Sequence, residues 1–263
     1  MTNPRLMGIV NVTPDSFSEG GRYADPEAAI DHGRRLLAEG AAILDVGGES
    51  TAPGATPVSL EVELERTEPV VAALAGEGAT VSVDTAKAAV AAAALDAGAG
   101  IVNDVTALRG DPEMAPLCAE RGATVVLTHM LGTPATMQDH PSYREVVADV
   151  REFFAERLAA ATAAGIDEER VWLDPGIGFG KTDAHNATLL ARLGELAELG
   201  RPLVVGTSRK SFIGRLDGSP PGERLGGTIA SSLVAAANGA AVLRVHDVAE
   251  MRQALRVTSA VLG

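Results

Sequence analysis

Six acidic or amide residues stand at the ends of short apolar runs, where they could bind a ligand. They are Asn11, Asp45, Asp84, Asn103, Asp104 and Asp174. Taken singly, each could be the N-cap of a following helix. Caps alone do not explain why a polar residue follows an apolar run so often, whereas strand ends that meet at one pocket would. Carboxylates and amides there suit a nitrogen-rich heterocycle, or a divalent metal held through few protein oxygens.

Basic residues gather at two similar places near the C-terminus. Ser208, Arg209 and Lys210 follow one apolar run, and Arg244 and His246 end the next. A solvated basic turn would explain the first group alone. It explains poorly a second basic pair on the adjacent run of a chain whose formal net charge is -13. Because arginine offers a bidentate fork for phosphate oxygens, we predict a phosphate site here.

The segment 176–182 reads GIGFGKT and resembles a nucleotide-binding P-loop. That pattern needs four residues between its first glycine and Gly-Lys-Thr, and this chain has three. A P-loop is therefore disfavoured. We interpret the glycines as room for the backbone to approach a flat ligand, with Phe179 as an aromatic wall, and an ordinary flexible loop is the alternative.

The histidines give no sign of a zinc site. His129 could be a ligand or a satisfied core histidine, and we favour the second. His32, His140 and His185 are predicted on helices or loops. The chain has neither an HExxH motif nor paired Cys/His spacing.

The elements that must position these residues alternate along the chain. Apolar runs cover residues 6–12, 42–46, 80–83, 100–102, 123–127, 171–173, 202–205 and 241–245. Helical spacing covers 25–39, 60–75, 86–97, 112–121, 143–164, 184–199, 225–238 and 248–262. Eight such units in 263 residues predict a (β/α)8 TIM barrel with its active site at the C-terminal ends of the strands.

The positions of helix-ending glycines and of long loops agree with a single barrel domain over residues 1–263. Several predicted helices end at glycines that suit a left-handed C-cap, namely Gly40, Gly98, Gly122, Gly165 and Gly239. The first two strand-to-helix connections, residues 13–24 and 47–59, are long and rich in Gly and Pro. Long loops at this face are usually lids or binding segments.

Composition excludes some classes of partner. The net charge of -13 argues against nucleic acid and against anionic membranes, because both would repel this chain. A single cysteine, Cys118, excludes an intramolecular disulfide and is expected to be a small buried apolar residue. We see neither a secretory signal nor a membrane span, so we expect a soluble, cytoplasmic protein.

The strand-end motifs together resemble one enzyme family, dihydropteroate synthase. The matching segments, in family order, are MGIVNVTPDSFSEGG, DVGGEST, SVDT, IVNDVT, THMLGTPATMQ, LDPGIGFGKT, GTSRKSFIG and RVHDV. The resemblance implies a (β/α)8 barrel, a homodimer and Mg²⁺. It also implies condensation of 6-hydroxymethyl-7,8-dihydropterin pyrophosphate with p-aminobenzoate in folate biosynthesis.

Roles carry over from the family residue by residue. Asn11 resembles the metal-linked asparagine, and Thr51 lies in a loop near the substrates. The implied pterin-binding set is Asp84, Asn103, Asp174 and Lys210. Arg244 and His246 resemble the pyrophosphate pocket, and Ser208, Phe179 and Pro53 are implied near the aminobenzoate. Asp84, Lys210 and Arg244 are implied to take part in catalysis.

The chain departs from the family pattern at Ala52. The family usually reads Ser-Thr-Arg-Pro-Gly where this chain reads Ser50, Thr51, Ala52, Pro53 and Gly54. The resemblance implies that, in the family, this arginine helps hold the anion. One alternative is therefore a pterin-binding paralogue or methyltransferase-type domain with weak or no condensation activity. A non-catalytic binding protein is a third possibility, but it predicts degraded strand ends.

Overall fold

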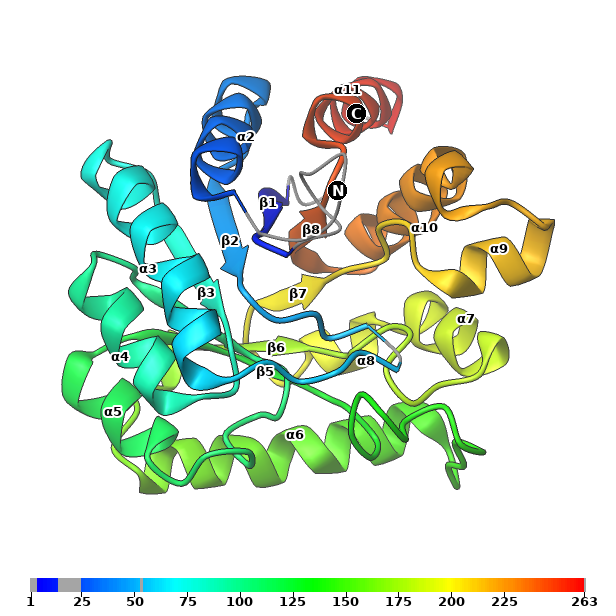
Figure 1. Ribbon diagram of the computed structural model, residues 1–263. Coiled ribbons are helices and arrows are strands. Elements are labelled where there is room, and N and C mark those ends of the chain that lie inside the picture. The colour runs from blue at the N-terminus through cyan, green and yellow to red at the C-terminus, as the bar shows by residue number, and fades with distance from the viewer. Residues whose placement is uncertain (1–3, 14–24, 53, 263) are drawn as a thin grey trace.

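A computed structural model describes residues 4–13, 25–52 and 54–262. Its strands form a closed parallel barrel in the order β1 to β8, surrounded by helices (Figure 1). The strands are β1 (Arg5–Asn11), β2 (Ile43–Gly47), β3 (Val81–Asp84), β4 (Ile101–Asp104), β5 (Thr124–Thr128), β6 (Val171–Asp174), β7 (Leu203–Val205) and β8 (Ala240–Val245). The predicted (β/α)8 class is confirmed.

Helices follow the strands as expected, with one split and one addition. They are α2 (Pro26–Glu39), α3 (Leu60–Gly76), α4 (Ala88–Asp96), α5 (Met114–Arg121), α6 (Val146–Ala163), α7 (Asp183–Ala191), α8 (Gly194–Ala197), α9 (Ser211–Asp217), α10 (Leu225–Ala237) and α11 (Val248–Leu262). Single 3₁₀ turns lie at η1 (Glu168–Arg170) and η2 (Pro221–Glu223). The single helix predicted over 184–199 is wrong, because the chain breaks between α7 and α8.

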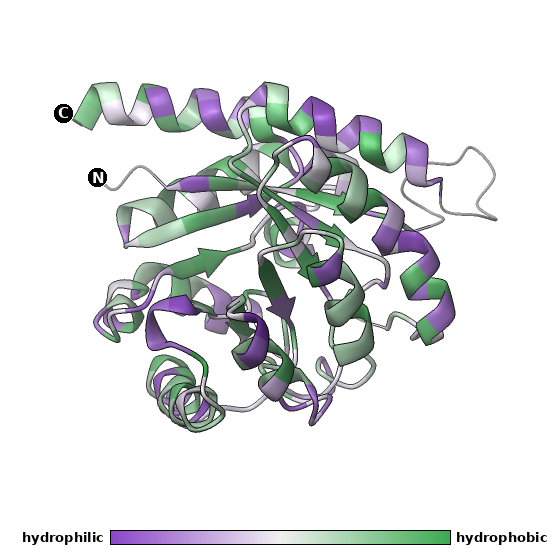
Figure 2. Cartoon of the chain, turned by 90° about the vertical axis from the view of Figure 1, so that its left-hand side faces the viewer, coloured by the Kyte–Doolittle hydropathy of each residue, from purple (hydrophilic) through white to green (hydrophobic). Residues whose placement is uncertain are grey.

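Two apolar layers hold the barrel together. Inside it, an apolar floor is formed by Met7, Ile43, Ile101, Val126, Trp172, Val204 and Val242. The other strand faces pack against the helices in the larger core, which also buries Cys118. Figure 2 shows apolar strands, and a C-terminal helix that alternates between apolar and polar residues. That alternation is typical of a helix with one face on the core.

The barrel floor fixes which residues face the pocket. Side chains alternate across a strand, so the residue two positions beyond each floor residue also points inward, one layer closer to the C-terminal mouth. Those positions hold Ile9, Asp45, Asn103, Thr128, Asp174, Gly206 and Arg244. Alternation thus converts an apolar floor into a mostly polar layer above it.

Strand and helix ends explain two further expectations. The strands run to include Asn11, Asp84, Asn103 and Asp174, so these are strand residues rather than helix caps. The five glycines predicted to stop helices all have positive φ, between 59° at Gly122 and 110° at Gly40. In the described part of the chain, no helix is both long and apolar enough to cross a membrane.

Candidate active site

A cavity of about 690 Å³ opens at the C-terminal end of the barrel. That volume suits a drug-sized ligand. The cavity is lined by ten of the eleven site residues expected from sequence: Asn11, Thr51, Asp84, Asn103, Asp174, Phe179, Ser208, Lys210, Arg244 and His246. The eleventh, Pro53, lies outside the described residues, as does the first loop over 14–24. Chain segments far apart in sequence therefore build one site.

Arg244 is the central cation of this site. Its Nε donates to Asp45 Oδ2 at 2.6 Å and its Nη2 donates to Asp84 Oδ2 at 2.8 Å. Burial would lower the pKa of Arg244, but the two carboxylates raise it, so the guanidinium stays charged. Burial raises the pKa of Asp84 to about 7, and Arg244 opposes that rise.

Asp45 is one of the six strand-end residues that the sequence singled out, but the sequence reasoning gave it no role of its own. It is fully buried, and besides Arg244 it accepts a hydrogen bond from Asn103 Nδ2 at 3.0 Å. Asp45 therefore orients both the Arg244 guanidinium and the Asn103 amide. Its position two residues after Ile43 of the floor is the signal that could have found it.

A second wall of the cavity combines Asp174, Lys210 and Phe179. Asp174 is 6% exposed, and its Oδ1 accepts from Gly176 N at 2.7 Å. Burial raises the pKa of Asp174, although Lys210 and the Gly176 N–H oppose the rise. Lys210 Nζ donates to the carbonyl of Ile177 and lies 4.4 Å from the centre of the Phe179 ring. An aromatic face beside a carboxylate and an ammonium suits a flat ring with polar edges.

Burial makes Lys210 an easily titrated group. Desolvation lowers the pKa of Lys210 to about 8, with Arg244 acting in the same direction and Asp174 against it. Lys210 is thus mostly charged at neutral pH but loses its proton far more readily than an exposed lysine.

Ser208 and His246 come from neighbouring strand ends and meet. His246 Nδ1 lies 2.8 Å from Ser208 Oγ, and the His246 backbone N–H donates to the same oxygen at 3.2 Å. Burial, followed by Arg244, lowers the pKa of His246 to about 4. The expected second cation is therefore a neutral imidazole at pH 7 when no ligand is bound, and it serves as a hydrogen-bonding group.

Two residues singled out by the sequence lie away from the cavity. Asp104 accepts from the backbone of Thr106 at 2.7 Å and of Leu108 at 2.8 Å, so it orders its own loop. Asp104 is not a helix cap either, because the next helix, α5, begins only at Met114. His129 is buried against Tyr143 and Phe153, which confirms it as a satisfied core histidine.

The lysine of GIGFGKT is Lys181, and its contacts are with protein groups, so no phosphate ligand is needed to explain it. It is fully buried, and its Nζ lies 2.8 Å from His129 Nδ1 and donates to the Phe179 carbonyl at 3.0 Å. Burial strongly lowers the pKa of Lys181, and Lys210 adds to the shift. The side chain ties the loop after β6 to the end of β5. Its role is structural.

The glycines of this loop make room mainly for protein. A Cβ at Gly176 would lie 1.9 Å from the His129 carbonyl oxygen, and one at Gly180 would lie 2.7 Å from Leu131 Cβ. Our interpretation that they make room for a flat ligand is wrong for these two positions. Gly178 and Phe179 do line the cavity, so the aromatic-wall prediction stands.

Several further cavity residues were given no role by the sequence reasoning, although Thr128 and Gln138 begin and end the segment THMLGTPATMQ. Arg215 of α9 and Arg224, beside η2, line the mouth, as do Thr128 and Gln138. Gln138 Nε2 donates to the Gly178 carbonyl at 2.6 Å, joining the loops after β5 and β6. Thr128 lies two residues beyond Val126 of the floor, so strand alternation could have found it. The two arginines reach the cavity through the path of the chain along α9 and η2.

The fold and these contacts define a (β/α)8-barrel enzyme with a combined site for a polar ring and an anion. Residues 7–246 match the family model described as pterin binding enzyme. A curated Escherichia coli dihydropteroate synthase is 48% identical over all of this chain and 93% of its own length. The chain belongs to the pterin-binding enzyme family and, within it, to the dihydropteroate synthases.

Solved structures agree with that placement. Xanthomonas albilineans dihydropteroate synthase with 4-aminobenzoic acid has a TM-score of 0.92 and 52% identity, covering 99% of this chain and 93% of that one. The same enzyme in complex with 7,8-dihydropteroate has a TM-score of 0.89 and 48% identity, covering 100% of this chain and 96% of that one.

Proposed function

We propose that this chain condenses 6-hydroxymethyl-7,8-dihydropterin pyrophosphate with p-aminobenzoate, giving 7,8-dihydropteroate and pyrophosphate. The observation that carries the proposal is that one cavity joins a ring-binding wall, Asp174 with Lys210 and Phe179, to an anion-binding side, Arg244 with Ser208 and His246. The relatives add support, since related structures hold 4-aminobenzoic acid or 7,8-dihydropteroate.

The ring wall would select the pterin. Asp174 is a buried double acceptor, and it can receive paired hydrogen bonds from the amino-pyrimidine edge of the ring. Asn103, held by Asp45, offers both a donor and an acceptor to the same plane. A ring without matching groups would leave these buried polar atoms unpaired, which costs affinity.

Catalysis follows from how the leaving group is held. The C–O bond at the pterin methylene breaks, and pyrophosphate departs with the electron pair. Arg244 would stabilise the developing negative charge, and Ser208 and His246 would hydrogen-bond to it. The cation left at the methylene is delocalised into the ring. The amine nitrogen then bonds to that carbon and loses a proton, and it needs no strong general base because its lone pair is free.

We further propose Mg²⁺ as the metal partner of this reaction. Asn11 ends β1 and lines the cavity, and its amide oxygen is a hard ligand. Among the described residues, no group of three His, Cys, Asp or Glu side chains could hold a metal ion. This fits Mg²⁺, which often keeps its waters and binds through substrate phosphates and few protein oxygens. When bound, it would offset the charge of the pyrophosphate.

We also propose that the protein is a homodimer and that it lies in the cytoplasm. Support for the dimer comes from exposed apolar side chains on the adjacent helices α10 and α11. They are Leu225, Val234, Val257, Val261 and Leu262. Covering such a patch with a second copy would remove it from water. Light scattering would give the mass in solution, and cell fractionation would test the location.

The decisive experiment incubates the protein with dihydropterin pyrophosphate, p-aminobenzoate and Mg²⁺. Dihydropteroate and pyrophosphate should appear together in equal amounts. Chelation of Mg²⁺ should suppress both, and Asn11→Ala should reduce the gain in pyrophosphate affinity that Mg²⁺ gives. Pterin binding without any product would favour a pterin-binding paralogue or methyltransferase-type domain instead.

A further inference from the structure

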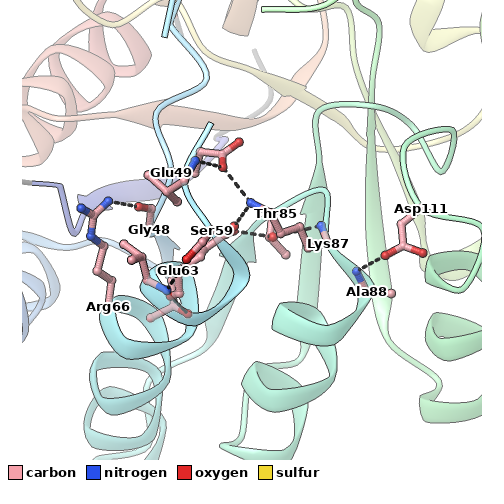
Figure 3. A network of polar contacts seen from close by, with 12 residues as sticks. Gly48, Glu49, Ser59, Glu63, Arg66, Thr85, Lys87, Ala88 and Asp111 are labelled. Carbon is pink, nitrogen blue, oxygen red and sulfur yellow. Dashed lines mark hydrogen bonds and ion pairs between the residues drawn. The ribbon is translucent and has the colours of Figure 1, made fainter. Parts of the chain in front are cut away.

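A polar network at the edge of the cavity, which its member Glu49 lines, joins three segments of the barrel face. Lys87 Nζ donates to Glu49 Oε2 at 2.7 Å and also contacts Glu63 Oε2 (Figure 3). Thr85 Oγ1 donates to Glu63 Oε1 at 2.5 Å. Glu49 belongs to the loop after β2, Glu63 to α3, and Thr85 with Lys87 to the loop after β3. The lysine is thus the common partner of two carboxylates from different segments.

The network also closes the second loop on itself. Glu49 Oε2 accepts from the backbone N–H of Val58 at 2.9 Å, so the start of the loop binds its end. The preceding carbonyl, that of Gly48, accepts from Arg66 Nη1 at 2.8 Å, which fixes the loop base on α3. Lys87 therefore holds a loop whose two ends already meet at one carboxylate.

The held loop forms part of the cavity wall, whereas Lys87 does not. Ser50, Thr51 and Ala52 follow Glu49 directly and line the cavity. A smaller neighbouring cavity of about 220 Å³ is lined by the same loop and by Pro134 of the loop after β5. Gly54 N donates to the Pro134 carbonyl at 3.0 Å, so the second loop also spans toward that segment.

We infer that Lys87 is a positioning residue, which sets the second loop for the amine substrate by holding Glu49 beside Glu63. The inference rests on the proposed condensation, and it assigns a role to a residue outside the substrate-binding set. The lysine acts through Glu49 and does not itself line the cavity.

The difference in burial between the carboxylates of Glu49 and Glu63 explains why the position of the loop depends on Lys87. The Glu63 side chain is 1% exposed and cannot leave its site, whereas the Glu49 side chain is 25% exposed and can turn to solvent. Without the ammonium, two like charges would face each other, and Glu49 would be the one to move. Burial lowers the pKa of Lys87, but bonds to Glu49 and Glu63 outweigh it and raise that pKa, so the clamp is charged at neutral pH.

The two substrates should respond differently to loss of this clamp. Three members of the pterin-binding set, Asp84, Asn103 and Asp174, lie on strands, and the position of a strand does not depend on the second loop. The second loop contains Pro53, which the family resemblance implies lies near the aminobenzoate. Binding of the amine substrate should therefore depend on how this loop is held. Weakening the clamp should therefore raise KM for p-aminobenzoate and leave the dissociation constant of the pterin nearly unchanged.

The test compares Glu49→Gln, Lys87→Met and Lys87→Arg with a matched control, Arg121→Met. Arg121 pairs with Asp96 between α4 and α5, and both side chains are exposed. Glu49→Gln and Lys87→Met should each raise KM for p-aminobenzoate about tenfold, the scale of one charge-assisted hydrogen bond. Lys87→Arg should recover most of the loss. The control and the pterin dissociation constant should change less than about twofold.

Two outcomes would overturn the inference. One is an unchanged KM for p-aminobenzoate in Glu49→Gln. The other is an equal loss of affinity for both substrates together with a lower melting temperature, which would mean a structural role only. If Lys87→Met does not fold, Lys87→Arg and the exchange measurement on Glu49→Gln decide, because Glu49 itself lines the cavity and its KM alone would not separate positioning from contact.

A readout without turnover separates this inference from the proposed function. Hydrogen exchange over residues 50–57 should be faster in Glu49→Gln than in the parent, while exchange in α5 stays the same. If the parent fails to condense the substrates, the proposed function fails, yet the exchange measurement still reports the clamp. Unchanged exchange over 50–57 would reject the clamp whether or not the parent is active.

Discussion

Arg244 Nη2 of β8 lies 2.8 Å from Asp84 Oδ2 of β3, so the cation proposed to bind the anion is joined to a residue proposed to bind the pterin. The same guanidinium donates to Asp45 of β2 through Nε. The groups proposed for ring recognition and for leaving-group stabilisation are therefore parts of one buried charge network. A change in either carboxylate will be felt by the arginine, and the reverse also holds.

Replacing Arg244 with Met should weaken pyrophosphate binding and also destabilise the fold. Loss of the guanidinium leaves two buried carboxylates without a cation, a change that typically costs about 3 to 5 kcal/mol. Adding Asp45→Asn should recover part of the stability but none of the affinity for pyrophosphate. Lys210→Met, in contrast, should weaken the pterin more than the anion. Calorimetry with pyrophosphate alone tests this, and unaltered binding to Arg244→Met would remove the arginine from the anion site.

Asp174→Asn should weaken binding of a pterin that lacks the pyrophosphate by about 1.5 to 3 kcal/mol, because an amide replaces a charged double acceptor. Asp104→Asn is the matched control. Asp104 also ends a strand, but its carboxylate binds its own loop rather than lining the cavity. The control should lower stability and keep pterin affinity. Calorimetry gives both dissociation constants, and equal values for Asp174→Asn and the parent would contradict the assignment.

Pterin affinity should fall as the pH rises through about 8, where Lys210 loses its proton. Stability should change in the opposite sense. The folded pKa lies below the ordinary value of 10.5, so between pH 8 and 10.5 the unfolded state holds a proton that the folded state has lost. Stability contributed at this site therefore rises with pH across that window. Lys210→Met should lack both effects, and pH titrations of affinity and of unfolding that match those of the parent would show that another group titrates.

The barrel could be predicted from sequence because strand and helix periods are local properties. Each apolar run and each terminating glycine has a meaning that does not depend on distant residues. α9 was not predicted, because its seven residues are too few for a helical period to show, and only Phe212 and Ile213 of it are buried. The break between α7 and α8 was likewise hidden within a continuous apolar pattern.

Site residues could be predicted where a polar side chain lies at the end of a strand. They were predicted less well where the role of a side chain depends on its hydrogen-bond partners. Asp45 and Asp104 look alike in sequence, yet one binds Arg244 and the other its own loop. Lys181 stands in a segment that resembles a P-loop but was not expected to be one, and its partner His129 is 52 residues away. Such pairings depend on which strands become neighbours. They also depend on burial, which lowers the pKa of Lys181 beside the His129 imidazole.

Ala52→Arg should strengthen binding of the pterin pyrophosphate. Ala52 lines the cavity on the loop that Lys87 holds, so an arginine there could contact the phosphates with two nitrogens. We expect a gain of about 1 to 3 kcal/mol, roughly 5- to 100-fold, after part of the contact is offset by ordering a long side chain. Calorimetry with the pyrophosphate and with the pterin alcohol measures the effect.

The gain should be absent for the alcohol, which has no phosphates, and should shrink with added salt where the site is open to solvent. Ala52→Gln is the control for side-chain length without charge, and it should give a smaller gain or none. Equal gains for both ligands would indicate general stabilisation of the loop. No gain for either would mean that another cation already serves the anion, and Arg209, Arg215 and Arg224 already line the mouth of the same cavity. Combining Ala52→Arg with a methionine at each of these positions in turn would then identify the residue that takes the place of the missing arginine.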